Sequence, residues 1–266
     1  MKRIIAFVLS LICVISLAGC GLLFDQELKD EISEIIENSD VQLVTEYYHH
    51  LQEVNIEYAN GNTRKLQYTY PEAANQFLED YIGCIVFENG QQVRSEEYVR
   101  DENDNIISIV SNSETTTFTI TYDANSLITQ KAILVDGVEV GHEEYFYNED
   151  GLITEYSVHE SNNLVERVVI DYDENGNRTK ITRYNGAGSV ISYDVCEYDQ
   201  KNYKEKVSQY DANGELLGYV MNSYDIYGLI LVEEAYDASG NLLSKTTRRY
   251  ENGEITYDAA KGYPGK

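Results

Sequence analysis

The sequence has few basic residues. It contains 20 Lys and Arg against 46 Asp and Glu, which gives a formal net charge of −26. This shortage excludes nucleic-acid binding, which needs a basic face, and direct adsorption to anionic lipid. The acidic excess is typical of a protein kept soluble at an anionic cell surface, and it would also favour cationic peptides or divalent metals as ligands.

The sequence also lacks the common catalytic motifs. There is no His-Glu-x-x-His, no Gly-x-Ser-x-Gly elbow, no P-loop and no Cys-x-x-Cys pair. Of the four histidines, we interpret His142, which precedes two glutamates, as part of an exposed polar cluster. Asp171–Gly176 matches the first half of a calcium loop, but Thr182 stands where that loop needs Glu. We therefore predict no catalytic residue, no metal, no cofactor and no enzymatic activity.

Tryptophan is absent and phenylalanine is scarce, whereas tyrosine is abundant. The chain has 24 Tyr, six Phe and no Trp. A ring with a hydroxyl at its tip can cover a β-sheet and still be wetted, which suits strands without a thick second layer. Aromatic faces also bind sugar rings, so the tyrosines have two interpretations, as a packing ladder or as a binding surface.

The N-terminus reads as a bacterial lipoprotein signal. A basic start, Met1-Lys-Arg, precedes an apolar stretch that ends in Leu17-Ala-Gly-Cys20. The apolar run is too short to span a membrane comfortably, and its last four residues match a lipobox. We predict a signal peptide over 1–19, acylation of Cys20 (for example with palmitate) and an extracytoplasmic protein anchored to the lipid bilayer of the cell membrane.

Few cysteines remain for other purposes. Cys13 leaves with the signal peptide and Cys20 takes the lipid, so Cys84 and Cys196 are the remaining thiols. Two cysteines outside the cytoplasm can pair, but they lie far apart along the chain. We expect each to be a small buried apolar residue, with a disulfide as the alternative.

The dominant positive feature is an internal repeat of Tyr, then Asp or Asn, then Gly three or four residues later. From Tyr172 the intervals alternate between 12 and 14 residues up to Tyr250, a 26-residue unit of two unequal halves. Asx and Gly are turn formers, and the segments between them are rich in β-branched and aromatic residues, which favours hairpin-connected antiparallel strands. The repeat tyrosines are Tyr147, Tyr172, Tyr184, Tyr198, Tyr210, Tyr224, Tyr236 and Tyr250.

The spacing predicts more than strands. Because an unequal repeat shears a sheet and makes it coil, we expect an all-β fold, an open, coiled sheet of repeated antiparallel hairpins. Both intervals are even, so all repeat tyrosines should lie on one face as a candidate binding ladder. His159 occupies a Tyr position and should be a member of the same row.

These residues resemble the YD (RHS-type) repeat, whose phrase is Tyr-Asp-x-x-Gly. Phe87-Glu-Asn-Gly90 is also similar to the repeats of MORN-like proteins. Large YD members wind a β-strip into a shell around a C-terminal toxin. Here the chain ends soon after Tyr250, so we expect no toxin domain and no closed shell.

The N-terminal third departs from the repeat. Residues 25–38 carry Leu and Ile at helical spacing, and residues 71–82 run from a Pro to the residue before Gly83, so we expect one or two short helices there. The predicted organisation is a lipid-anchored segment over 20–82 with a hairpin near 55–70, a repeat array over 83–258 and a tail over 259–266. No linker-like composition separates these parts, which favours a single domain.

Lipid anchoring, repetition and the missing motifs together predict a non-catalytic binding module for a glycan, a peptide or an envelope protein. A structural scaffold of the cell envelope, pairing through an exposed sheet edge, is the alternative. A hydrolase would require an acid pair or a Ser/His site in a pocket and is the third interpretation.

Overall fold

The chain divides into two compact units, residues 1–47 with 254–266 and residues 48–253. The computed structural model describes residues 43–71, 81–112 and 114–258, so nearly all described residues belong to the second unit. The predicted signal peptide, Cys20, the helix over 25–38 and the tail lie outside the described residues, as does most of the helix predicted over 71–82. The described chain contains no helix long and apolar enough to span a membrane.

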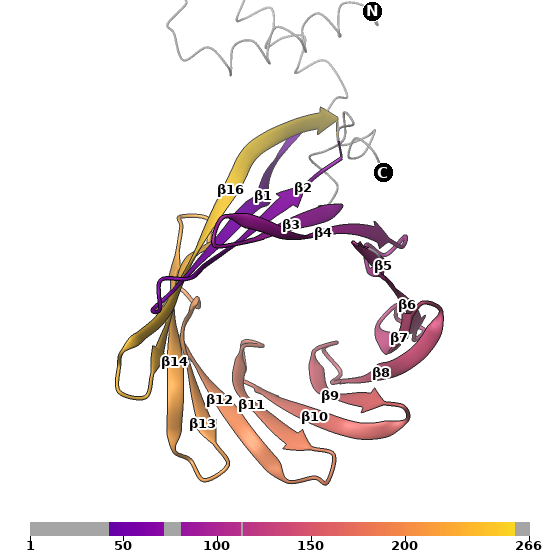
Figure 1. The fold of residues 1–266 in the computed structure, drawn as a ribbon, viewed down its shortest axis with the longest axis vertical. Coiled ribbons are helices and arrows are strands. Elements are labelled where there is room, and N and C mark those ends of the chain that lie inside the picture. Colours follow the sequence, from indigo (N-terminus) through magenta and orange to yellow (C-terminus); the bar gives the residue numbers. More distant parts are fainter. Residues whose placement is uncertain (1–42, 72–80, 113, 259–266) are drawn as a thin grey trace, which may run out of the picture. The chain divides into compact units, whose positions relative to one another are not determined.

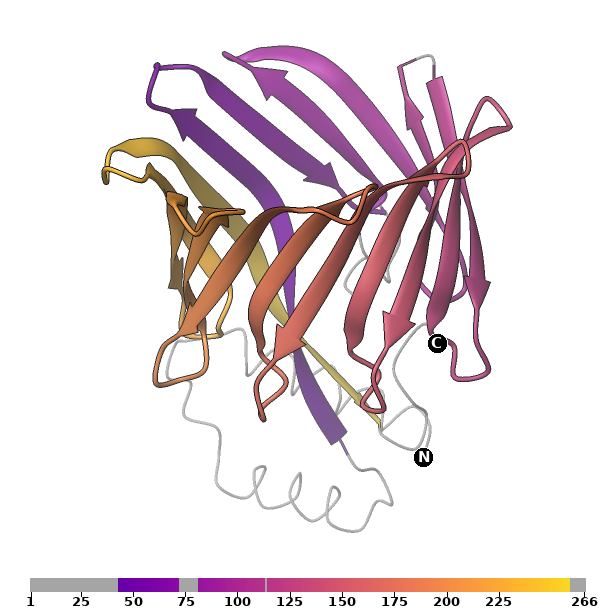
Figure 2. The same ribbon diagram turned by 90° about the horizontal axis from the view of Figure 1, so that it is seen from below.

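The described residues form sixteen antiparallel β-strands, which short turns join except between β2 and β3 (Figures 1 and 2). In chain order they are β1 (Leu43–Tyr58), β2 (Thr63–Thr69), β3 (Gly83–Glu88), β4 (Gln91–Arg100), β5 (Ile106–Ser111), β6 (Glu114–Tyr122), β7 (Ile128–Val135), β8 (Val138–Tyr147), β9 (Ile153–Glu160), β10 (Asn163–Tyr172), β11 (Arg178–Asn185), β12 (Val190–Tyr198), β13 (Lys204–Asp211), β14 (Leu216–Tyr224), β15 (Ile230–Asp237) and β16 (Leu242–Asp258). The prediction of an all-β fold is confirmed.

The sheet is a closed barrel, so the prediction of an open, coiled sheet is wrong. Each strand pairs with its neighbours in chain order, and β16 pairs with β1 (Figure 1). At this seam the Ala59 N–H donates to the carbonyl of Leu243 over 2.8 Å, and Arg249 lies 3.8 Å from Glu53. Closure pairs the backbone N–H and C=O groups that an open sheet edge would leave unpaired. No local sequence pattern indicates this pairing, because it joins strands at opposite ends of the chain.

Nine turns within the described repeat use the same hydrogen bonds, which Asp173 illustrates. Its Oδ1 accepts the N–H groups of Asn175 and Asn177, both over 2.9 Å, and its carbonyl accepts the N–H of Gly176 over 3.1 Å. Gly176 has a φ of +79°, which glycine adopts without steric cost. The two side-chain bonds recur at Asp101, Asp123, Asn148, Asn185, Asp199, Asp211, Asp225 and Asp237.

A β-bulge lies beside the repeat tyrosines from Tyr147 to Tyr236 and overturns the prediction of a one-sided ladder. In the β10–β11 pair, Asp171 faces Lys180 while Tyr172 faces Arg178, so one extra residue is inserted. Equivalent shifts occur at the following tyrosines. From Tyr172 onward each interval crosses one bulge, and because one extra residue reverses the side-chain direction, neighbouring repeat tyrosines from Tyr172 to Tyr250 lie on opposite faces of the sheet.

The two faces differ in their buried apolar residues. Among the residues that the structure describes, all six buried apolar residues lie on one face, with Val168 at 0% and Val86 at 1% exposure. Side chains converge on the concave side of a curved sheet and spread on the convex side, so we assign the buried face to the inside of the barrel. The inner residues of this set are Val54, Cys84, Val86, Val168, Ile170 and Cys196.

The turns provide a stability test. Ser126 occupies the position of Gly176 in its own turn and has a φ of +64°. Because a non-glycine residue pays a steric cost there that exceeds glycine's entropic cost, Ser126→Gly should stabilise the protein and Gly176→Ser should destabilise it, each by about 0.5–1 kcal/mol. Urea unfolding measures both changes, and effects of the same sign would contradict the turn assignment.

Candidate functional site

The repeat tyrosines that point into the barrel act as cross-strand ties. The hydroxyl of Tyr172 donates to the carbonyl of Ile153 over 2.7 Å, and the hydroxyl of Tyr147 to that of Ile128 over 2.8 Å. In each case the acceptor is the first residue of the strand that immediately precedes the tyrosine's own strand. The same tie, over 2.8–3.1 Å, is made by Tyr198, Tyr224 and Tyr250. We call these five residues the inner tyrosines.

The outer tyrosines, Tyr184, Tyr210 and Tyr236, have different contacts. Tyr210 stacks on Tyr193 with ring centroids 5.1 Å apart, and Tyr236 stacks in the same way on Tyr219 at 5.0 Å. The guanidinium of Arg167 lies 4.6 Å from the ring centroid of Tyr184. The eight predicted ladder residues are therefore divided between the two faces, and each has a partner within the protein.

The inner face is polar rather than filled by apolar packing. Arg183 Nη2 donates to Asp194 Oδ2 over 2.8 Å, and this bond raises the pKa of Arg183. Asp194 also lines a pocket of ≈ 290 Å³ across β12–β16. Charged inner residues of both signs include Arg64, Arg94, Glu96, Lys131, Glu143, Glu166, Arg183, Asp194, Glu233 and Arg248.

Two inner carboxylates bind tyrosine hydroxyls. Tyr98 donates to Glu96, and Tyr145 donates to Glu143 over 2.5 Å. Burial, followed by the bond to the neighbouring carboxylate, raises the pKa of both tyrosines. Both phenols therefore stay neutral and remain hydrogen-bond donors at physiological pH.

On the outer face, the seam between β16, β1 and β2 is held by ion pairs around Glu53. Lys65 Nζ lies 2.6 Å from Glu53 Oε2, and Asn55 Nδ2 donates to Glu53 Oε1 over 2.8 Å. The bond from Lys65, followed by the bond from Asn55, lowers the pKa of Glu53. With Arg249 at 3.8 Å, one carboxylate contacts side chains from all three strands.

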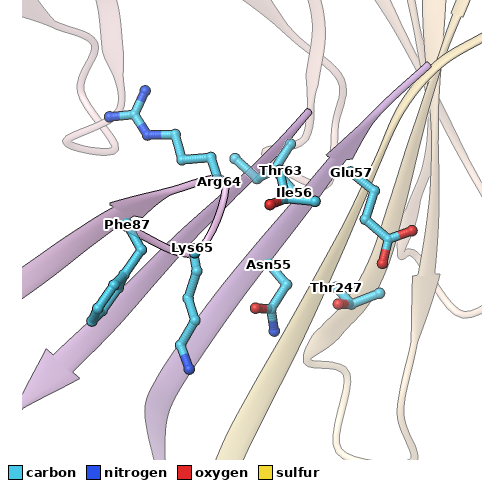
Figure 3. A pocket seen from close by; sticks show the side chains of 9 residues that line it. Asn55, Ile56, Glu57, Thr63, Arg64, Lys65, Phe87 and Thr247 are labelled. Atoms are coloured by element: carbon cyan, nitrogen blue, oxygen red, sulfur yellow. The ribbon is translucent and has the colours of Figure 1, made fainter. Parts of the chain in front are cut away.

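A pocket of ≈ 500 Å³ lies beside this network (Figure 3). Lys65 and Asn55 point in one direction from the sheet, and Arg64 points in the opposite direction. The Lys65 ammonium lies 5.8 Å from the centroid of the Phe87 ring. The lining residues, from β16, β1, β2, β3 and their turns, are Asn55, Ile56, Glu57, Thr63, Arg64, Lys65, Phe87, Gly90 and Thr247. We call this the seam pocket.

The structure brings together histidines that the sequence analysis treated separately. His142 and His159 are opposite each other on β8 and β9, with rings stacked at 4.5 Å and 10°. Glu144, predicted only as part of an exposed cluster, lies within 4 Å of both. The two histidines lie at nearly equal distances before and after the Tyr147–Gly151 turn, once one inserted bulge residue is allowed for. This spacing is the signal in the sequence that could have identified the contact.

The remaining predictions concern cysteine and calcium. Cys84 and Cys196 are buried and unpaired, on β3 and β12, so the expectation of small buried residues is confirmed and the disulfide alternative is wrong. Burial raises the pKa of both thiols. In the calcium-like segment, the side chain of Asp173 is bonded within its own turn.

Comparisons with known proteins assign no family. No family model and no curated protein matches the chain. Among solved structures, a porin-like protein from Bacteroides uniformis is 10% identical over 76% of this chain and 98% of that chain, with a TM-score of 0.35. The TcdB2-TccC3-Cdc42 structure is 13% identical over 77% of this chain and 12% of that chain, with a TM-score of 0.29. A putative outer membrane lipoprotein-sorting protein domain from Vibrio parahaemolyticus is 9% identical over 78% of this chain and 85% of that chain, with a TM-score of 0.24. Similarity at this level assigns neither a family nor a function.

The seam network should make stability depend on pH. Because the pKa of Glu53 is lowered in the folded protein, its stabilising effect is present above the ordinary value of 4.5 and is lost as pH falls through the lower folded value. Glu53→Gln should therefore destabilise the protein at neutral pH, by at most about 1 kcal/mol because Lys65 is partly exposed. The difference from wild type should disappear in acid.

Urea unfolding at a series of pH values measures this difference. Glu197→Gln is the matched control, since Glu197 pairs with Lys206 on the outer face but is 56% exposed and lies away from the seam. A Glu53→Gln effect that does not change with pH would contradict the role of the charge.

Proposed function

We propose that this protein is an extracytoplasmic lipoprotein of the YD-repeat type, anchored in the cell membrane by acylated Cys20, that binds a glycan without catalysing a reaction. The N-terminal lipobox supports the location. The seam pocket is the observation that carries the binding proposal.

The composition of the seam pocket suits a sugar. Phe87 provides an aromatic ring, and Asn55, Glu57 and Thr247 provide an amide, a carboxylate and a hydroxyl. Ligand sites combine an apolar surface with a few polar groups that fix orientation. Glu53 holds the Asn55 amide and the Lys65 ammonium in place before any ligand arrives, which lowers the cost of ordering them on binding.

Charge narrows the kind of glycan. The protein carries a net charge of −26, and the ammonium of Lys65 is already paired with Glu53. Polyanionic glycans would be repelled from such a surface. A neutral or amino-sugar glycan is therefore the ligand that we propose, and a peptide is an outcome that the binding test can distinguish.

The envelope scaffold is less well supported than a binding role. Its proposed route was the pairing of an exposed sheet edge, and the closed barrel leaves no free edge among the strands of residues 48–253. Both sets of repeat tyrosines are engaged by other groups of the protein, so the seam pocket rather than the tyrosine ladder is the site that we propose.

Glycan binding can be tested with the full-length protein in detergent. We expect an array of neutral and amino-sugar glycans and peptides to give glycan hits. Phe87→Ala and Asn55→Ala should weaken those hits about tenfold in calorimetric titrations, the loss expected for a stacking or hydrogen-bonding contact of about 1.4 kcal/mol. Phe146→Ala is the control, because Phe146 is 51% exposed on the outer face of β8.

Phe87→Leu keeps an apolar group of similar bulk but has no aromatic face. It therefore separates the loss of ring stacking on a sugar from a loss of folding caused by a missing side chain. Hits restricted to peptides would contradict the glycan proposal. Equal effects of the Phe87 and Phe146 variants, or losses confined to Tyr210→Ala, would contradict the seam pocket as the site.

The anchor has its own test. Cys20→Ser removes the acylated thiol, so the protein should lose incorporation of a labelled fatty acid and move from the membrane to the soluble fraction. Cys196→Ser, at a buried cysteine on β12, should keep both the label and the membrane location. Unchanged fractionation of Cys20→Ser would contradict lipid anchoring.

A further inference from the structure

Four polar side chains on the outer face of β8 and β9 form two adjacent cross-strand pairs. His142 is opposite His159, and Glu144 is opposite Ser157. Cβ atoms in such pairs are separated by roughly 4.5–5.5 Å, so all four side chains share a small patch. No other group of at least three His, Cys, Asp or Glu side chains within the described ranges has ligand atoms placed to hold one ion.

The distances suit a shared metal ion. Glu144 Oε1 lies 3.8 Å from His142 Nε2, and Glu144 Oε2 lies 3.7 Å from His159 Nε2. One ligand atom from each of the three residues lies within 4.8 Å of the others. Two ligands at about 2.0–2.1 Å from a tetrahedral zinc are about 3.3 Å apart, so small rotations of these side chains would complete the coordination.

The surroundings of the pair are those of a metal site. His142 is 9% exposed, and Glu139 Oε1 lies 3.6 Å from its Nδ1, in the position of the carboxylate that orients a ligating imidazole. Ser157 Oγ lies 3.1 Å from His159 Nε2, the same nitrogen that faces Glu144, so a metal bound there would replace this hydrogen bond. The Glu144 side chain is 41% exposed, so the cluster is reachable from solvent.

We propose that His142, Glu144 and His159 bind a divalent transition metal with the preferences of zinc. Imidazole nitrogen selects zinc, copper or nickel over calcium and magnesium. Three protein ligands leave the fourth tetrahedral position to water. The bound ion would clip β8 to β9 on the outer face, independently of any ligand in the seam pocket.

The test uses the full-length, chelator-treated protein and zinc chloride at neutral pH. Calorimetric titration should give one zinc per chain, and cobalt chloride should produce the visible absorption of tetrahedral cobalt. Zinc should also raise the unfolding temperature, because the ion binds the folded state. His159→Tyr and Glu144→Gln should each weaken zinc binding at least tenfold and abolish the rise in unfolding temperature.

His159→Tyr is chosen because it should fold, since tyrosine is the residue that equivalent positions of the repeat use, as at Tyr184. His49→Gln is the matched control: His49, on β1, bonds to Asn252 away from the cluster, and its variant should bind zinc as wild type does. Absence of zinc binding to the wild type, equal binding to His159→Tyr, or an equal loss in His49→Gln would each overturn the proposal.

Discussion

The single extra residue beside each hairpin turn is the constraint on which the rest of the barrel depends. Asp or Asn closes the turn with two side-chain bonds, a residue of positive φ ends it, and a bulge follows on the next strand. One bulge reverses side-chain direction, so two bulges per 26-residue unit restore it. Tyr172 and Tyr198 therefore share the inner face, whereas Tyr184 between them points outward. The same small insertion determines which tyrosines become cross-strand ties and which stack against cations and other rings.

Bulges also increase twist and bend the strands that carry them. Repeated through successive hairpins, this bending brings the last strand to the first and turns a linear repeat into a barrel. Closure occurs between strands distant in sequence, and the seam is where the chain supplies residues outside the repeat. At the seam, the Glu53 carboxylate contacts Lys65, Asn55 and Arg249, which come from three strands. A sixteen-stranded barrel is too wide for its inner side chains to fill, which explains why polar pairs such as Arg183–Asp194 line it instead of a packed core.

The limits of sequence reasoning follow from the same features. The turns and hairpins were predictable because Asp173 and Gly176 act within five residues of each other. The face of each tyrosine was not, because the even spacing from Tyr172 to Tyr184 hides an inserted residue that carries no distinctive side chain. Closure was also missed, since the contact between β1 and β16 has no local signal. The pairing of His142 with His159 could have been predicted, because the two lie at nearly equal distances from a recognisable turn. The prediction required allowing for the one residue that the bulge inserts between them.

These observations suggest where specific chemistry lies in a repeat protein of this kind. A residue that recurs in every unit has a recurring partner, as the Tyr172 hydroxyl has in the Ile153 carbonyl, and a group engaged in that way has little capacity left for a ligand. Residues that depart from the repeat do not have such a recurring partner. His159 replaces an outer tyrosine and meets a second histidine and a carboxylate, and the β1–β3 region, where the repeat is weakest, contains the seam pocket. Residues that recur in every repeat unit therefore build the barrel, whereas residues that depart from the repeat are available for binding.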